Sequence, residues 1–228
     1  MVVQHNLTAM NTNRQLGLTT SAQAKSTEKL SSGYKVNRAG DDAAGLTISE
    51  KMRSQIRGLN KASDNAQNGV SLVQTAEGAL NEAHSILQRM NEIATQAAND
   101  TNTTSDRTAI QKEIDQLSTE LTRISSTTQF NTMNLLDGNF KNKNLQVGAL
   151  SGQKITISIT SMSATTLGVD ALKVSSFTSA GTAMCAIQKA ISRVSAQRSD
   201  LGAIQNRLEY TINNLDTTSE NTSSAESL

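Results

Sequence analysis

Apolar and small side chains recur about every 3.5 residues over a long stretch in the first half of the chain. The positions are Met52, Ile56, Leu59, Ala62, Ala66, Val70, Val73, Ala76, Leu80, Ala83, Leu87, Met90, Ala94 and Ala97. This period is typical of a helix that packs along a partner in a left-handed coiled coil. We expect one helix of about 55 residues, beginning at Ala43 or Ala44 and about 80 Å long, which indicates a rod rather than a globule.

Two further helices follow the same period. One is marked by Ile110, Ile114, Leu117, Leu121 and Ile124. Thr104 or Ser105 can cap its beginning. The other lies near the C-terminus and is marked by Met184, Ile187, Ile191, Val194, Leu201, Leu208, Ile212 and Leu215. Arg198 and Gln205 occupy two further seam positions of that helix. Three helices with one shared period predict a bundle, in which the middle helix returns alongside the first.

Between the second and third helices the period changes to two. Apolar residues alternate with polar ones from Leu145 to Ala149 and again from Ile155 to Ile159. Ser151 and Gly152 supply a turn between the two runs. The pattern predicts a β-hairpin.

Both ends of the chain carry few apolar side chains. The first 33 residues predict a weak helix that needs a partner. Helices gain most of their stability by packing one face, so we expect residues 1–32 to be mobile in the isolated protein. The last 13 residues, 216–228, are almost wholly polar and predict a frayed tail.

Composition excludes several classes of protein. The chain has no proline, which suits long helices, and only one cysteine and two histidines, which supply neither an internal disulfide nor a zinc site. A net charge of +1 and 2% aromatic residues argue against nucleic-acid binding. No apolar run is long enough to cross a membrane, and the N-terminus lacks the pattern of a secretory signal peptide. We expect no cofactor and no metal.

Three kinds of residue invite a chemical interpretation. Asp41 and Asp42 precede the long helix, where carboxylates cap the helix and complement its positive end. No histidine or third carboxylate lies near them in sequence, so we do not expect an enzyme. His84 is interpreted as a surface or seam residue. Cys185 is interpreted as a small apolar packing residue, and an exposed thiol that pairs between molecules is the alternative.

Long literal stretches of the chain resemble bacterial flagellins. They are residues 29–46 (KLSSGYKVNRAGDDAAGL), 48–53 (ISEKMR), 55–59 (QIRGL), 74–82 (QTAEGALNE), 129–131 (QFN), 135–138 (LLDG) and 190–209 (AISRVSAQRSDLGAIQNRLE). The stretches cover nearly the whole chain in the family's order. In flagellins the N- and C-terminal helices form an inner core domain, and the next layer is a rod of three helices and a β-hairpin. The resemblance therefore implies a mainly α, elongated helical bundle with a small β-hairpin.

The resemblance also implies a division of the chain into five segments. They are an inner-core segment and linker (1–42), the N-terminal rod helices (43–130), the hairpin with its connecting turns (131–178), the C-terminal rod helix (179–215) and a polar tail (216–228). The interval between the hairpin and the last helix is too short for the outer, hypervariable domains of longer flagellins. The family pattern continues beyond Leu228 through a helix that pairs with the N-terminal one, so we expect the inner domain to hold half of its helices.

Membership of this family implies a structural subunit of the extracellular flagellar filament, which drives swimming. Such subunits pass through the flagellar type III export apparatus without cleavage and contact other flagellin subunits and the filament cap and junction proteins. The residues implied in filament assembly are Leu7, Leu30, Arg53, Ile56 and Leu59. Two alternatives remain open: a shortened chain that does not polymerise and acts only as a soluble receptor ligand, and a hook-associated junction protein of the same superfamily.

Flagellins are also sensed by a host toll-like receptor, and the stretch from Leu87 to Ala94 resembles the recognised motif. The implied receptor contacts are Leu87, Gln88, Arg89, Glu92, Ile93 and Glu113. Arg89 is the expected anchor, because its planar guanidinium satisfies several acceptors at once. Ile93 stands where the family commonly has leucine, and Asn91 where many members carry a second arginine, so we expect weaker recognition. Alternatively, these polar side chains face neighbouring subunits in the filament.

Overall fold

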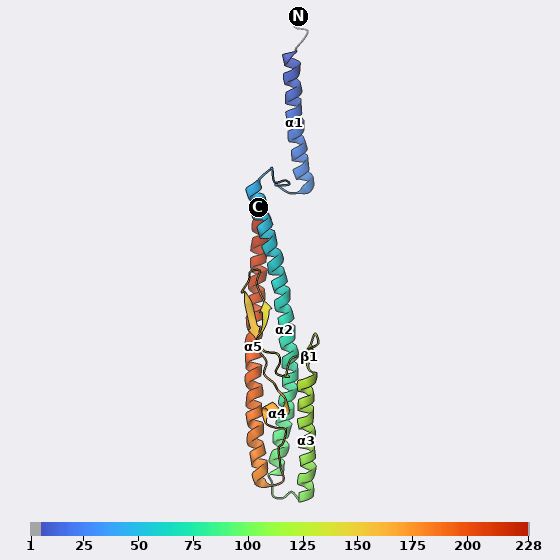
Figure 1. Cartoon of the computed structure of the whole chain (residues 1–228), viewed down its shortest axis with the longest axis vertical. Coiled ribbons are helices and arrows are strands. Elements are labelled where there is room, and N and C mark those ends of the chain that lie inside the picture. Colours follow the sequence, from blue (N-terminus) through green and yellow to red (C-terminus); the bar gives the residue numbers. More distant parts are fainter. Residues whose placement is uncertain (1–5, 228) are drawn as a thin grey trace. The chain divides into compact units, whose positions relative to one another are not determined.

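The computed structural model describes residues 6–227, which form helices and two small antiparallel strand pairs (Figure 1). The predicted fold class, mainly α with a small β-hairpin, is confirmed. The chain divides into two compact units. Unit 1 comprises the chain up to Gln55 and again from Ser223, and unit 2 comprises Ile56–Thr222. Within the described residues, no helix is long and apolar enough to cross a membrane.

Nine elements follow one another along the described chain. They are α1 (Leu7–Ser32), α2 (Ala43–Ala97), α3 (Thr104–Thr127), β1 (Gln129–Phe130), β2 (Met133–Asn134), β3 (Lys143–Gln146), β4 (Lys154–Ile157), α4 (Ala164–Leu167) and α5 (Phe177–Ser227). The three long helices predicted from the heptads are therefore present as α2, α3 and α5.

In unit 2, α2, α3 and α5 lie side by side and share one hydrophobic core (Figure 1). The predicted seam of α2 is buried from Ala62 onward, except for the half-buried Val70, and Leu80 and Leu87 have no exposed surface. Leu72 and Ile93 are buried as well, which widens the apolar stripe beyond a strict seam. A wider stripe lets α2 pack against two partner helices at once.

The buried face of α5 differs in detail from the prediction. Its seam uses alanines, and Met184, Ile191 and Ile212 are only half-buried. The buried residues of α5 are Ala180, Ala183, Ile187, Ala190, Val194, Gln197, Leu201, Leu208 and Leu215. Small alanines let helix backbones approach closely, so the contact line lies one position away from the larger side chains. For the same reason, the polar residue in this seam is Gln197 and neither Arg198 nor Gln205.

Gln197 is buried because the segment after β4 satisfies it. Its Oε1 accepts hydrogen bonds from the backbone N–H (3.2 Å) and the hydroxyl (2.9 Å) of Thr160, and its Nε2 donates to the carbonyl of Ser158 (3.4 Å). A buried amide with partners for both of its ends avoids the desolvation cost of an unpaired polar group. The side chain thereby ties the connector to α5.

The helix ends show how local sequence starts and stops each helix. Asp42 accepts a hydrogen bond from the N–H of Gly45 (2.8 Å), which confirms its capping role at α2, whereas Asp41 accepts from the N–H of Arg38 (3.2 Å). The cap of α3 is Thr103 rather than Thr104 or Ser105. Thr103 forms a reciprocal capping box with Asp106, which satisfies two free N–H groups.

The predicted β-hairpin is confirmed as β3 paired with β4, with Leu145 opposite Ile155. Gly152 in the turn has a φ of 87°, which suits glycine. On α2, a Cβ atom at Gly69 would overlap the side chain of Leu145. The hairpin therefore rests directly on the backbone of α2, and Asn65 adds a hydrogen bond from its Nδ2 to the carbonyl of Gln146 (3.1 Å).

Three short elements, β1, β2 and α4, were not expected from the sequence. β1 and β2 pair through a turn in which Asn131 and Thr132 have φ values of 48° and 64°. Asparagine is common in the left-handed region, but threonine is rare there, so Thr132 does not mark a turn in the sequence. α4 is a single turn capped by Ser163 and ended by Gly168, and it is too short for periodicity to reveal it.

In unit 1, α1 is a regular helix without a single buried residue. Asn6 caps its beginning, and Gly33 ends it in the left-handed conformation. Residues 1–5 of the segment expected to be mobile lie outside the described residues, and the mobility of the remainder stays a prediction. The expected frayed tail is absent, because α5 continues as a helix to Ser227.

The capping box makes the start of α3 sensitive to acid. Hydrogen bonds from Thr103 hold the pKa of the Asp106 carboxyl below its ordinary value of 3.8. Because the folded-state pKa is the lower one, this stabilisation is complete above the unfolded-state pKa and is lost as the pH falls through the folded-state pKa. We expect Asp106→Asn to lower the free energy of unfolding in urea near neutral pH, and to do so less below pH 3.8.

Asp200→Asn, which neutralises an exposed carboxyl on α5, is the matched control and should have little effect at either pH. An Asp106→Asn effect of equal size in neutral and acidic solution would contradict the role of the charged cap.

Candidate functional site

The motif from Leu87 to Ala94 lies on α2, where two of its residues face the core. Leu87 and Ile93 have 0% and 1% of their surface exposed. Gln88, Arg89 and Glu92 are exposed. The helical repeat produces this division, because residues three or four apart share a face while their neighbours point away. Of the six implied receptor contacts, the structure therefore places Leu87 and Ile93 inside the bundle.

Arg89 connects α2 to α3 through an ion-pair cluster. Its Nε and Nη2 atoms donate to Oε1 of Glu113 at 3.0 and 2.9 Å, and its Nη1 donates to Oε2 of Glu92 at 3.3 Å. The hydrogen bonds with Glu113 and Glu92 raise the pKa of the Arg89 guanidinium above its ordinary value. The three side chains are between 44% and 68% exposed, so the cluster is accessible and carries one net negative charge. The structure thus brings Arg89, Glu92 and Glu113 together, three of the six residues that the resemblance implies.

The next turns of α2 extend this surface with amide and imidazole groups. Gln88 Nε2 lies 3.0 Å from His84 Nε2. His84 and Asn91 are half-buried, and both His84 Nδ1 and Asn91 Oδ1 are buried without a hydrogen-bond partner. Asn91, which stands where many family members carry arginine, therefore does not project into solvent as Arg89 does.

The residues implied in assembly occupy two kinds of environment. Leu7 and Leu30 of α1 are 75% and 88% exposed. Ile56 and Leu59 on α2 are half-buried. Two of these four side chains are therefore fully available to another molecule, and two are covered in part by this chain.

Arg53 is held by carboxylates from two elements of unit 1. Its Nη2 donates to Glu226 Oε1 at 2.8 Å, and its Nη1 lies 3.5 Å from Glu50 Oε1. Ser49 Oγ also donates to Glu226 Oε1, at 2.9 Å. The hydrogen bonds from Arg53 and Ser49 lower the pKa of Glu226. Sequence reasoning missed Glu226, because a residue in a polar tail gives no sign of a partner far back along the chain.

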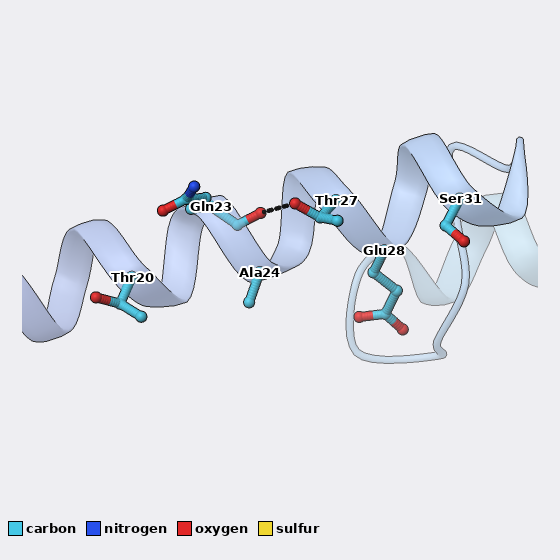
Figure 2. A pocket seen from close by; sticks show the side chains of 6 residues that line it. All are labelled: Thr20, Gln23, Ala24, Thr27, Glu28 and Ser31. Atoms are coloured by element: carbon cyan, nitrogen blue, oxygen red, sulfur yellow. Dashed lines mark hydrogen bonds between the residues drawn. The ribbon is translucent and has the colours of Figure 1, made fainter.

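One face of α1 is hollowed over about 520 Å³ (Figure 2). Its lining side chains recur every three or four residues along the helix: Thr20, Gln23, Ala24, Thr27, Glu28 and Ser31. Thr27 turns its hydroxyl inward to the backbone carbonyl of Gln23 (2.9 Å). Thr20, Ala24, Thr27 and Ser31 are the short side chains along this face, and they lie one helical turn apart.

The groups considered for chemistry show no convergent arrangement. In the part of the chain that the structure describes, no three His, Cys, Asp or Glu side chains come together to hold a metal. Cys185 is exposed, so the interpretation as an apolar packing residue is wrong. The alanine-based seam of α5 explains this, since Ala183 and Ile187 take the inward positions on either side of it.

Two family models match most of the chain. A family model of the bacterial flagellin N-terminal helical region matches residues 3–141, and one of the flagellin C-terminal helical region matches residues 184–228. The chain belongs to the bacterial flagellin family. In this flagellin the two matched regions contain the whole of α1, α2 and α3 and most of α5.

Curated relatives match over the full length of this flagellin. A flagellin of Halalkalibacterium halodurans is 53% identical over all of the chain and 84% of the relative. A flagellin of Bacillus subtilis is 47% identical over all of the chain and 86% of the relative. A crystal structure of Bacillus cereus flagellin is similar with a TM-score of 0.59 and 31% identity, over 67% of this chain and 88% of that one.

A putative flagellar hook-associated protein from Vibrio parahaemolyticus has a TM-score of 0.69 over 83% of this chain and 99% of that one. Its sequence is 15% identical, so the likeness concerns the fold alone. The hook-associated alternative therefore gains no support beyond a shared fold.

Because Leu87 is fully buried, the stretch from Leu87 to Ala94 should contribute to the stability of the bundle in the free protein. We expect Leu87→Ala to lower the free energy of unfolding by about 2–5 kcal/mol, because it removes a fully buried side chain from the seam. The neighbouring Gln88→Ala, at an exposed position, should change it by less than about 0.5 kcal/mol. Urea denaturation followed by circular dichroism measures both. Equal effects of the two substitutions would show that Leu87 does not support the bundle.

Proposed function

We propose that the chain is a structural subunit that polymerises with copies of itself into the extracellular flagellar filament used for swimming. The observation that carries the proposal is α1, a helix of 26 residues that buries none of them. It exposes Leu7, Met10, Leu16, Leu18 and Leu30, each by at least 60%. Burying such side chains stabilises by about 1.5–3 kcal/mol each, and contact with further subunits supplies that burial.

Unit 2 has the properties that a filament wall needs. Its helices pack along a continuous aliphatic core, and the part of α2 inside this unit spans about 60 Å. Long packed helices resist bending and offer a large lateral area to neighbouring subunits. The similarity to flagellins of Halalkalibacterium halodurans and Bacillus subtilis over the full chain supports the same role.

The proposed route and partners follow from family membership. The subunit passes through the flagellar type III export apparatus and then contacts the filament cap, the junction proteins and other subunits. A flagellin that does not polymerise and serves only as a soluble receptor ligand is the competing function, and polymerisation distinguishes the two.

Polymerisation is tested with the purified full chain by ultracentrifugation and negative-stain electron microscopy. We expect sedimenting filaments, and we expect Leu7→Asn with Leu30→Asn to raise the critical concentration about tenfold or more, because two leucines lose their burial in the polymer. Phe177→Asn, at a 63% exposed position of α5, is the control for a general loss of surface hydrophobicity.

The variants leave the buried core untouched, so circular dichroism of the monomers should match that of the wild type. A wild-type chain that remains monomeric at high concentration would refute polymerisation and favour the soluble ligand. Equal polymerisation of the double variant and the wild type would refute the part assigned to α1.

A second function is supported by the exposed cluster on α2 and α3. We propose that a host toll-like receptor recognises Gln88, Arg89, Glu92 and Glu113 directly, while Leu87 and Ile93 position them from the core. Arg89 is already held by Glu113 and Glu92, so its guanidinium is oriented before the receptor arrives. Such preorganisation lowers the entropic cost of binding.

Receptor affinity is measured with the purified ectodomain by surface plasmon resonance. We expect Arg89→Ala to weaken binding at least about tenfold, as expected for a central arginine anchor, and Arg89→Lys to weaken it because the fork is lost while the charge remains. Lys61→Ala removes another exposed cation that is paired within α2, with Asp64, and should leave affinity unchanged. Unchanged affinity of Arg89→Ala would refute the anchor.

A further inference from the structure

The last turns of α5 are helical although the apolar seam has ended. Leu215 is the final buried residue of this helix, and between Asp216 and Ser227 the only apolar side chain is Ala225. A polar segment of this composition is not expected to hold a helix by burying a face. Other contacts must therefore account for its order.

In unit 2 these contacts are two hydrogen bonds between α2 and α5. Ser63 Oγ donates to Asp216 Oδ1 at 2.9 Å, and Ser219 Oγ donates to Asn60 Oδ1 at 2.6 Å. Ser63 is buried, so Asp216 satisfies a hydroxyl that water does not reach easily. Each hydrogen bond joins residues more than 150 positions apart in the sequence.

In unit 1 the corresponding contact is the carboxylate of Glu226. One oxygen, Oε1, accepts from Arg53 Nη2 and from Ser49 Oγ, at 2.8 and 2.9 Å. Glu226 is the more buried side chain of its ion pair, with 21% of its surface exposed against 41% for Arg53. Charge-assisted hydrogen bonds of this kind are shorter and stronger than those between neutral groups.

The three contacts share one register. On α2 the partners Ser63, Asn60 and Arg53 are separated by steps of three and seven residues towards the N-terminus, and on α5 Asp216, Ser219 and Glu226 follow the same steps towards the C-terminus. Equal steps in opposite directions are what an antiparallel helix pair requires, and seven residues is one heptad. The polar contacts thus continue the pairing where the apolar seam stops.

We propose that these contacts form a polar clasp in each unit, a conformational device that holds the end of α5 on α2 and opens independently of the apolar core. In unit 2 the polar clasp consists of Asn60 and Ser63 on α2 with Asp216 and Ser219 on α5, and in unit 1 it consists of Ser49 and Arg53 on α2 with Glu226 on α5. Water replaces hydrogen bonds between accessible groups at small cost, whereas opening the seam exposes fully buried leucines. The end of α5 therefore opens at a lower free energy than the rest of α5.

Hydrogen–deuterium exchange of the full chain, resolved by mass spectrometry, tests the clasp. We expect the wild-type amides between residues 217 and 227 to be protected, and less so than those between Ile187 and Leu208. Glu226→Ala and Asp216→Ala should each speed exchange in the first group about threefold or more, and leave the second group unchanged. Glu226→Gln keeps an acceptor for Ser49 and should have a smaller effect than Glu226→Ala.

The matched control is Glu120→Ala, which breaks an exposed ion pair with Arg123 inside α3 and should leave exchange in α5 unchanged. Three results would overturn the proposal. They are exchange between residues 217 and 227 at the rate of an unstructured chain in the wild type, no acceleration in either variant, and an equal acceleration between Ile187 and Leu208.

Discussion

The aliphatic core along α2 is the interaction on which the rest of this flagellin depends. Aromatic residues make up 2% of the chain, so the interior is built mainly from leucine, isoleucine, valine and alanine, with Met90, Met162 and Phe140 added. Leu80 and Leu87 of α2 and Leu201 of α5 have no exposed surface. Thin aliphatic side chains fit between closely spaced helices, whereas a wide globular core would need larger groups. The composition therefore favours long, narrow contacts over a thick centre.

Core packing and the proposed receptor contacts lie on the same few turns of α2. Because Leu87 and Ile93 are fixed in the core, the direction of the intervening Arg89 is fixed as well. The guanidinium then meets Glu113 of α3 only if α2 and α3 keep their relative position along the seam. A cavity in the core would thus disturb an exposed surface without altering any residue in it.

Sequence periodicity revealed the long helices and the hairpin because each repeats one signal over many residues. It failed where a single contact decides the outcome. Gln197 is buried because Thr160 and Ser158 satisfy it, and nothing near Gln197 in sequence announces those partners. The cap of α3 is Thr103, whereas the sequence predicted Thr104 or Ser105. Neighbouring residues offer the same hydroxyl group, and only the position of Asp106 distinguishes Thr103 from them. In the candidate site, the resemblance to flagellins indicated which residues belong together. Periodicity was misleading for α5, because its larger apolar residues suggested a contact line that placed Cys185 inside.

The ends of the described chain show two opposite relations between composition and order. α1 carries exposed leucines, among them Leu16 at 64%, and none of residues 6–227 buries them. The end of α5 carries almost no apolar side chain, yet Glu226 and Asp216 hold it to α2 by hydrogen bonds. Apolar surface gains free energy from any suitable cover, including another subunit, and therefore suits an assembling helix. Hydrogen bonds need donors and acceptors at fixed positions, so they specify the register of one partner and suit a contact made within the chain.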